Sequence, residues 1–113
     1  MINRGEVWLA NLNPTQGSEQ SGTRPVIIFQ TDVINKYVST VLTIPLTTNL
    51  KRAELPTCIF IAQDEGGLTN DSVALCHQTR VLDKTRLTNK LGVLPQETLL
   101  LLDKCMMFTM GII

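Results

Sequence analysis

Arg24 is the first residue whose type and position suggest chemistry. It follows Gly22 and Thr23 and precedes Pro25, where a polar stretch meets the apolar run VIIF. A residue before proline favours an extended backbone, so the Arg24 side chain is expected to project sideways from the start of a strand. Its guanidinium stays protonated and matches the shape of a phosphate or a carboxylate. Two interpretations stay open, an anion site and a solvated arginine at a strand end.

Thr47 and Thr48 stand at the end of a second apolar run, VLTIPL. A hydroxyl at this position can donate a hydrogen bond to a phosphate oxygen or to a transition-state oxyanion. Threonine is also the residue that β-propensity and turn chemistry favour at the end of a strand. Position alone does not separate the two roles.

Gln78 and Arg80 lie two positions apart in SVALCHQTRVL, which predicts one longer strand. Residues two apart on a strand share a face, about 7 Å from each other. An amide and a guanidinium at that spacing suit the contact of a base edge and a backbone phosphate. An exposed polar strand face would have the same composition. The alternation also points His77 away from both residues.

Acid–base and metal chemistry have few candidates in this chain. His77 is the only histidine, which excludes a mechanism with two histidines. Glu19, in a polar loop, is available as a general base, although a carboxylate is a weak base for a hydroxyl proton. No Asp, Glu and His cluster has metal-ligand spacing, and no phosphate-loop or nucleophile-elbow motif occurs. We therefore predict no metal and no cofactor.

Length and composition predict one small domain covering residues 1–113. Lys and Arg number 10 and Asp and Glu number 10, so any contact with a nucleic acid needs a local basic patch. The three cysteines form no C-x-x-C motif, which favours a reducing, cytoplasmic setting. No apolar run reaches about 18 residues, so no membrane span is expected.

The first two thirds of the chain read as short strands separated by turns. We predict five or six strands, of which five are read from the segments 5–12, 24–30, 39–47, 57–62 and 72–82. Segment 13–22 is a long polar loop and segment 32–37 a single helical turn. Pro45 implies a sheet edge or a bulge near the end of its strand.

The C-terminal segment predicts one helix. Pro95 and Glu97 suit its first turn and Gly111 suits its end. The residues between them are apolar most of the way round, and only Asp103 and Lys104 mark a wet side. Such a helix is expected to pack on the sheet and on a second subunit. The predicted fold is mainly β, an antiparallel sheet with a flanking helix, open or curled into a small barrel.

Several stretches together resemble the MazF/PemK family of bacterial toxin endoribonucleases. They are RGEVWLANLNPTQGSEQSGTRPVII, STVLTIPLTT, ELPTCIFI, GLTNDSVALCHQTRVLDKTRL and KLGVLPQETLLLLDKCM, which follow the family's order over nearly the whole chain. The resemblance implies an SH3-like antiparallel β-barrel with short helices and a C-terminal helix, acting as a homodimer.

The resemblance also implies an activity. Family members cleave single-stranded RNA, often mRNA, without a metal ion. The 2′-hydroxyl attacks the adjacent phosphorus and leaves a 2′,3′-cyclic phosphate and a 5′-hydroxyl. A cognate, MazE-like antitoxin neutralises the toxin by laying an extended tail across the RNA-binding surface.

The family's catalytic pair falls on Arg24 and Thr47, which would stabilise the charge of the phosphorane. Arg24 is also the expected proton donor or relay, and Glu19 a weak candidate for the base. The expected RNA contacts are Glu19, Gln20, Ser21, Gly22, Thr48, Gln78 and Arg80.

This chain departs from the pattern at two positions. Many relatives carry a glutamate at the position of His77, which bears on base preference, and a serine-like helix cap at the position of Pro95. Two other functions stay open because one fold hosts several. One is a protein-targeting toxin that inhibits DNA gyrase, and the other is a non-catalytic peptide-binding barrel. The presence of both Arg24 and Thr47 disfavours them.

Overall fold

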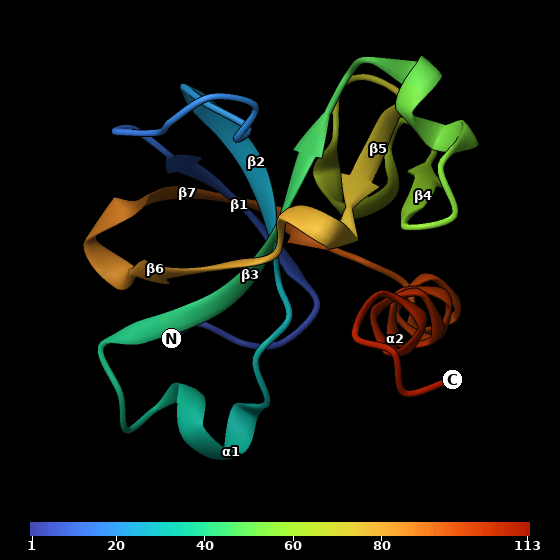
Figure 1. Ribbon diagram of the computed structural model, residues 1–113. Helices are drawn as coiled ribbons and strands as arrows, with labels where there is room; N and C mark the ends of the chain where they lie inside the picture. The colour runs from blue at the N-terminus through green and yellow to red at the C-terminus, as the bar shows by residue number, and fades with distance from the viewer.

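The computed structural model describes all 113 residues as a curled β-sheet flanked by a helix (Figure 1). The strands are β1 (Glu6–Asn11), β2 (Thr23–Ile28), β3 (Thr40–Thr47), β4 (Cys58–Ile61), β5 (Ser72–Leu75), β6 (Arg80–Asp83) and β7 (Leu87–Val93). The α-helices are α1 (Asp32–Asn35) and α2 (Gln96–Thr109). The 3-10 turns are η1 (Leu50–Glu54), η2 (Glu65–Gly67), η3 (Cys76–Gln78) and η4 (Lys84–Arg86).

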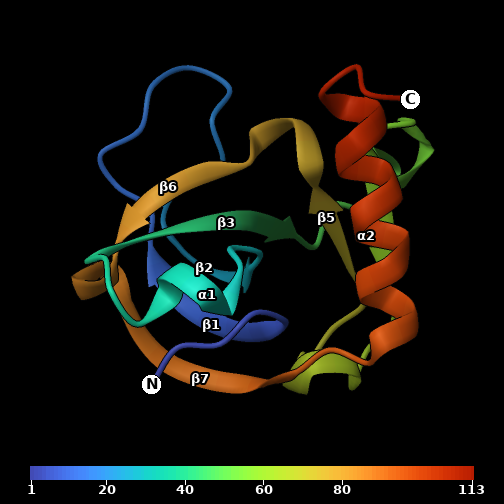
Figure 2. The same ribbon diagram turned by 90° about the horizontal axis from the view of Figure 1, so that it is seen from below.

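All strand pairs are antiparallel, in the order β4-β5-β3-β2-β1-β7, and β6 also pairs with β3. Figure 2 shows the sheet curling round on itself, with α2 beside β5. The fold class predicted from the sequence is therefore confirmed, a mainly antiparallel β structure with a C-terminal helix. The end strands β4 and β7 do not pair with each other, so the curl stops short of a closed barrel.

Strand β3 is central, so the sheet edge, one of the two alternatives inferred from Pro45 beside a bulge, is wrong. One side of β3 pairs with β2. The other side pairs first with β6, up to Thr43, and then with β5, from Leu46. Pro45 falls in the gap between these two partners. A residue without an amide proton is tolerated there because no ladder hydrogen bond is needed on that side.

The predicted single strand over 72–82 is wrong, because the chain turns in its middle. β5 ends at Leu75, η3 follows, and β6 begins at Arg80. Two hydrogen bonds fasten the chain to β3 just after the turn. The Thr79 hydroxyl donates to the Thr43 carbonyl at 2.8 Å, and the Thr43 hydroxyl donates to the Arg80 carbonyl at 3.0 Å. The turn lets one stretch of chain pair with both halves of β3.

Strand β7 was not predicted from the sequence. Its residues, LTNKLGV, include an asparagine, a lysine and a glycine, which have low strand propensity. The strand forms because it pairs with β1, where Glu6 lies opposite Val93. The Lys90 ammonium also lies 3.0 Å from the buried Glu6 carboxylate. Tertiary pairing therefore overrides weak local preference.

Three apolar clusters hold the fold together, and the smallest consists of Cys58, Val73 and Leu75, on β4 and β5. Of the other two, the larger one lies between the sheet and α2, and the smaller one fills the curl formed by β1, β2, β3 and β6. Helix α2 contributes Leu99, Leu102, Cys105 and Met106 to the larger cluster. Its opposite side leaves large apolar side chains exposed, namely Leu100, Leu101, Met107 and Phe108. Neither α2 nor the shorter α1 has the length and apolar character needed to cross a membrane.

Candidate functional site

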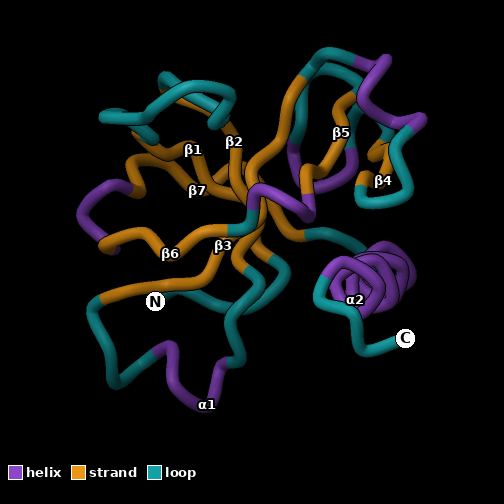
Figure 3. The backbone as a smooth tube through the Cα atoms, in the orientation of Figure 1, coloured by secondary structure: helices purple, strands orange, loops and turns teal.

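Residues 12–22, the loop between β1 and β2, form a flap over the end of the sheet. Figure 3 shows this loop projecting beyond β1 and β2. Its two ends are fastened together, because the Leu12 amide donates to the Gly22 carbonyl at 2.9 Å. The Gly22 amide donates to Oδ1 of Asn13 at 3.1 Å. The long loop predicted from the sequence is therefore present, with a fixed base.

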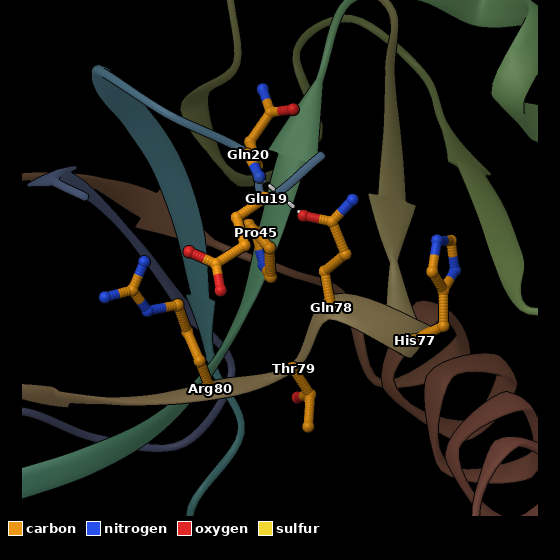
Figure 4. Close-up of a pocket in the computed structure, with 7 residues that line it drawn as sticks. All are labelled: Glu19, Gln20, Pro45, His77, Gln78, Thr79 and Arg80. Atoms are coloured by element: carbon orange, nitrogen blue, oxygen red, sulfur yellow. Dashed lines mark hydrogen bonds between the residues drawn. The ribbon is translucent and has the colours of Figure 1, made fainter. Parts of the chain in front are cut away.

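The Gln78 side chain forms two hydrogen bonds with this flap. Its Oε1 accepts a hydrogen bond from the Gln20 amide at 2.6 Å, drawn as the dashed line in Figure 4. Its Nε2 donates to the Ser18 carbonyl at 3.2 Å. The Gln20 side chain donates in turn to the Leu46 carbonyl of β3, at 3.4 Å. The flap is thus closed onto η3 and β3.

A groove runs between the flap and the segment 76–80. Its first part is a hollow of about 350 Å³ lined by Glu19, Gln20, Pro45, His77, Gln78, Thr79 and Arg80 (Figure 4). Its second part is a hollow of about 320 Å³ lined by Ser18, Glu19, Arg52, His77 and Gln78. Three residues line both parts, so the two hollows adjoin each other.

The structure brings Gln78, Arg80 and His77 to one groove. The prediction that His77 points away from the other two residues is wrong, because strand alternation ends at the η3 turn. Figure 4 shows Arg80 and His77 on either side of Gln78. Arg80 also donates from Nη1 to the Leu12 carbonyl at 3.1 Å, which ties it to the base of the flap.

Arg24 and Thr47 lie on neighbouring strands, β2 and β3. Val26 of β2 lies opposite Pro45 of β3, the paired register ends at this pair, and Arg24 and Thr47 lie beyond it. Neither residue lines the two hollows of the groove. Arg24 is exposed, donates from Nε to the Ser21 carbonyl at 3.1 Å, and takes part in no ion pair. Its two terminal nitrogens therefore have no carboxylate partner.

The Thr47 hydroxyl keeps its proton available. Its Oγ1 accepts a hydrogen bond from the Asn49 amide at 3.2 Å, so the hydroxyl proton can be donated elsewhere. Thr48 is one residue further on and lines different hollows, beside Pro25 and Asn70. Thr48 therefore lies away from the groove, whereas Thr47 ends the strand next to the one that carries Arg24.

The sequence interpretation missed Arg52 as a groove residue. It lies on η1, in the polar segment that follows Thr47 and Thr48. The available signal was the pair of basic residues in TNLKRAELP, Lys51 and Arg52. This segment has no strand or helix periodicity from which the direction of either side chain could be predicted.

The cysteines do not supply a nucleophile. All three are free and buried, and Cys76 immediately precedes His77. Burial raises the pKa of the Cys58 thiol and, more strongly, that of the Cys76 thiol. Both side chains therefore stay protonated near neutral pH, and a thiol is a poor nucleophile compared with a thiolate.

Comparison with known proteins decides the family. A model of the PemK-like, MazF-like toxins of type II toxin-antitoxin systems matches residues 3–109. The chain belongs to this family. A curated relative, the endoribonuclease MazF of Staphylococcus epidermidis, is 43% identical over 112 residues, covering 99% of this chain and 93% of the relative.

Solved structures share the MazF fold. MazF (Form-I) from Deinococcus radiodurans gives a TM-score of 0.84 at 22% identity, over 97% of this chain and 96% of that one. An endoribonuclease from a mycobacterial species, in complex with its cognate antitoxin, gives 0.83 at 21% identity, over 100% and 98%. At this level of sequence identity, the similarity to these solved structures shows the MazF fold only.

Proposed function

We propose that this chain is the toxin of a type II toxin-antitoxin system and a metal-independent, sequence-selective endoribonuclease that cleaves single-stranded RNA. Membership of the family and the name of the Staphylococcus epidermidis relative support the activity. The observation that carries the proposal is the Arg24 guanidinium, which has no carboxylate partner and lies on the strand next to the one that carries the Thr47 hydroxyl.

The proposed reaction is an in-line transesterification. The 2′-oxygen bonds to phosphorus, the bond to the 5′-oxygen breaks, and the products are a 2′,3′-cyclic phosphate and a 5′-hydroxyl. Extra negative charge develops on the phosphorane oxygens, where Arg24 neutralises it and Thr47 donates a hydrogen bond. The 2′-proton goes to a base, for which Glu19 is our candidate, and the 5′-oxygen receives a proton from or through Arg24.

RNA binding is assigned to the flap and the groove. The contacts are Glu19, Gln20, Ser21 and Gly22 from the flap, Thr48 beside Thr47, and Gln78 and Arg80 from the facing segment. Gln78 already uses both ends of its amide on the flap, so a base would have to take over one of these hydrogen bonds. Few phosphate contacts are needed, which is compatible with a chain of zero net charge.

The proposed partners follow from the same assignment. A MazE-like antitoxin would cover the groove and so block RNA. A second copy of the chain would cover the exposed apolar side of α2 and form a homodimer. The toxin would act in the cytoplasm, as one domain over residues 1–113, with neither metal nor cofactor.

Replacement of Arg24 tests the assignment. Arg24→Ala should slow cleavage of a single-stranded RNA in EDTA by about 10²–10³-fold, because one preorganised donor to the transition state is lost. The circular dichroism spectrum and melting temperature should stay unchanged, since the side chain is exposed. Lys36→Ala, which removes an exposed cation near α1, serves as the matched control.

Two results would overturn the proposal. One is wild-type cleavage by Arg24→Ala, which would show that the reaction occurs elsewhere. The other is a wild-type protein that cuts no RNA but inhibits DNA gyrase.

A further inference from the structure

The second part of the groove contains a positive charge with no assigned role. Arg52 lines this hollow together with Ser18, Glu19, His77 and Gln78, and it takes part in no ion pair. Glu19 is the only acidic residue in the lining, and its Oε1 accepts a hydrogen bond from the Gln16 amide at 2.8 Å. The guanidinium is therefore free to meet an anion that enters the groove.

His77 holds Arg52 in this position. Nη2 of Arg52 lies 3.5 Å from Nε2 of His77, and Nδ1 of His77 lies 2.8 Å from the Thr57 hydroxyl. Arginine can only donate, so Nε2 is the acceptor in the contact with Arg52. The imidazole ring therefore lies between the Thr57 hydroxyl and the guanidinium, and it brings no carboxylate that would cancel the positive charge of Arg52.

We propose that Arg52 binds a backbone phosphate of the RNA, one that flanks the scissile phosphate, and that His77 is its positioning residue. The inference rests on the proposed function, because the groove must hold single-stranded RNA. It adds a second anion site to the one assigned to Arg24. A guanidinium fits a phosphate through two parallel hydrogen bonds, and Arg52 has nitrogens to spare beyond the one near His77.

The experiment compares two variants in which a positive side chain is replaced by glutamine, at the neighbouring positions 52 and 51. Arg52→Gln should raise the KM for a single-stranded RNA about tenfold and change kcat less than about twofold, since a charged hydrogen bond is lost in both the ground and transition states. The slope of log KM against log salt should fall by about 0.7, the value for one phosphate contact on a single strand. Lys51→Gln, one residue away but outside the groove lining, should change neither quantity.

Variants of His77 test the positioning role. His77→Gln keeps a side-chain acceptor and should retain a KM near that of the wild type. His77→Glu places a carboxylate beside Arg52 and should raise the KM about as much as Arg52→Gln does, because the ion pair competes with phosphate.

Modified RNA provides a test that needs no variant. A series of RNAs carries one uncharged methylphosphonate at successive positions on each side of the cleavage site. In the wild type, one flanking position should raise the KM about as much as Arg52→Gln does. In Arg52→Gln, the same position should have no further effect.

The outcomes separate this inference from the proposed function. If the wild type cleaves no RNA, the proposed function and the Arg52 site are both wrong. If the wild type is active, two results would contradict the Arg52 site alone. One is a loss of affinity in Lys51→Gln as large as that in Arg52→Gln, and the other is a methylphosphonate effect that persists unchanged in Arg52→Gln.

Discussion

At the residue scale, Thr47 and Thr48 adjoin in sequence but belong to different surroundings. The Thr47 hydroxyl keeps its proton available, whereas Thr48 lines hollows beside Pro25 and Asn70. The two hydroxyls can therefore be tested against each other. A transition-state contact and a binding contact should affect different kinetic constants.

Thr47→Val should lower kcat about 10²-fold with little change in KM, because the valine cannot donate to the phosphorane. Thr48→Val should raise KM about fivefold and leave kcat unchanged, since only a binding hydrogen bond is lost. Steady-state cleavage of one RNA measures both. Thr47→Ser should keep most of the activity. A fall in kcat confined to Thr48→Val would move the catalytic hydroxyl to the second threonine.

The direction of a single side chain could be predicted where the neighbouring residues restrict the backbone conformation. The residue before Pro25 had to be extended, and Arg24 does lie in a strand with an exposed side chain. The prediction failed for His77, whose direction depends on the η3 turn. That turn has no Gly or Pro, and it is fixed by bonds to β3, a segment far away in sequence. Arg52 was missed for the same reason, since a distant contact directs it into the groove.

At the element scale, the flap depends on one side chain of the opposite wall. Gln78 accepts from the Gln20 amide and donates to the Ser18 carbonyl. Opening the flap therefore breaks two hydrogen bonds at once, each worth about 1 kcal/mol.

Gln78→Ala should accelerate hydrogen exchange of the Gln20 backbone amide by about tenfold or more, because the acceptor of that amide is removed. Exchange followed by NMR on the free protein measures the change, without any RNA. Gln63→Ala, an exposed glutamine in the turn after β4, should leave the Gln20 amide as protected as in the wild type. Equal protection in Gln78→Ala would mean that other contacts keep the flap closed.

The elements that the sequence predicted well have strong local signals. The helix over 96–109 has a proline before it and a glycine in the left-handed region after it. The strand β2 has three consecutive β-branched residues, all fully buried. β7 and the break after β5 have no comparable signal, because they arise from pairing with β1 and β3.

At the scale of the whole molecule, α2 has two apolar sides. One is buried against the sheet, and the other exposes Leu100, Leu101, Met107 and Phe108 around Lys104. Apolar residues so grouped on a helix are typical of a contact surface. It is the surface on which the sequence predicts a subunit contact, and our proposal of a homodimer uses it.

Leu101→Arg should weaken self-association on the order of 10²-fold, because an additional charge would be buried in the proposed contact. Sedimentation equilibrium over a range of concentrations measures the change. Val33→Arg, at an apolar residue that is 72% exposed on α1, provides the matched control. An unchanged mass for Leu101→Arg, or a monomeric wild type, would place the subunit contact elsewhere or remove it.

Leu46 belongs to two parts of the molecule at once. Its side chain lies in the same apolar cluster as Leu102 and Met106 of α2, and its carbonyl accepts the hydrogen bond from the flap residue Gln20. Thr47 is the next residue along β3. Leu46 is thus a direct link from α2 to the strand that carries Thr47, our proposed catalytic residue, and to the anchor of the flap. A partner docked on the outer side of that helix would be one layer of side chains away from both, without entering the groove.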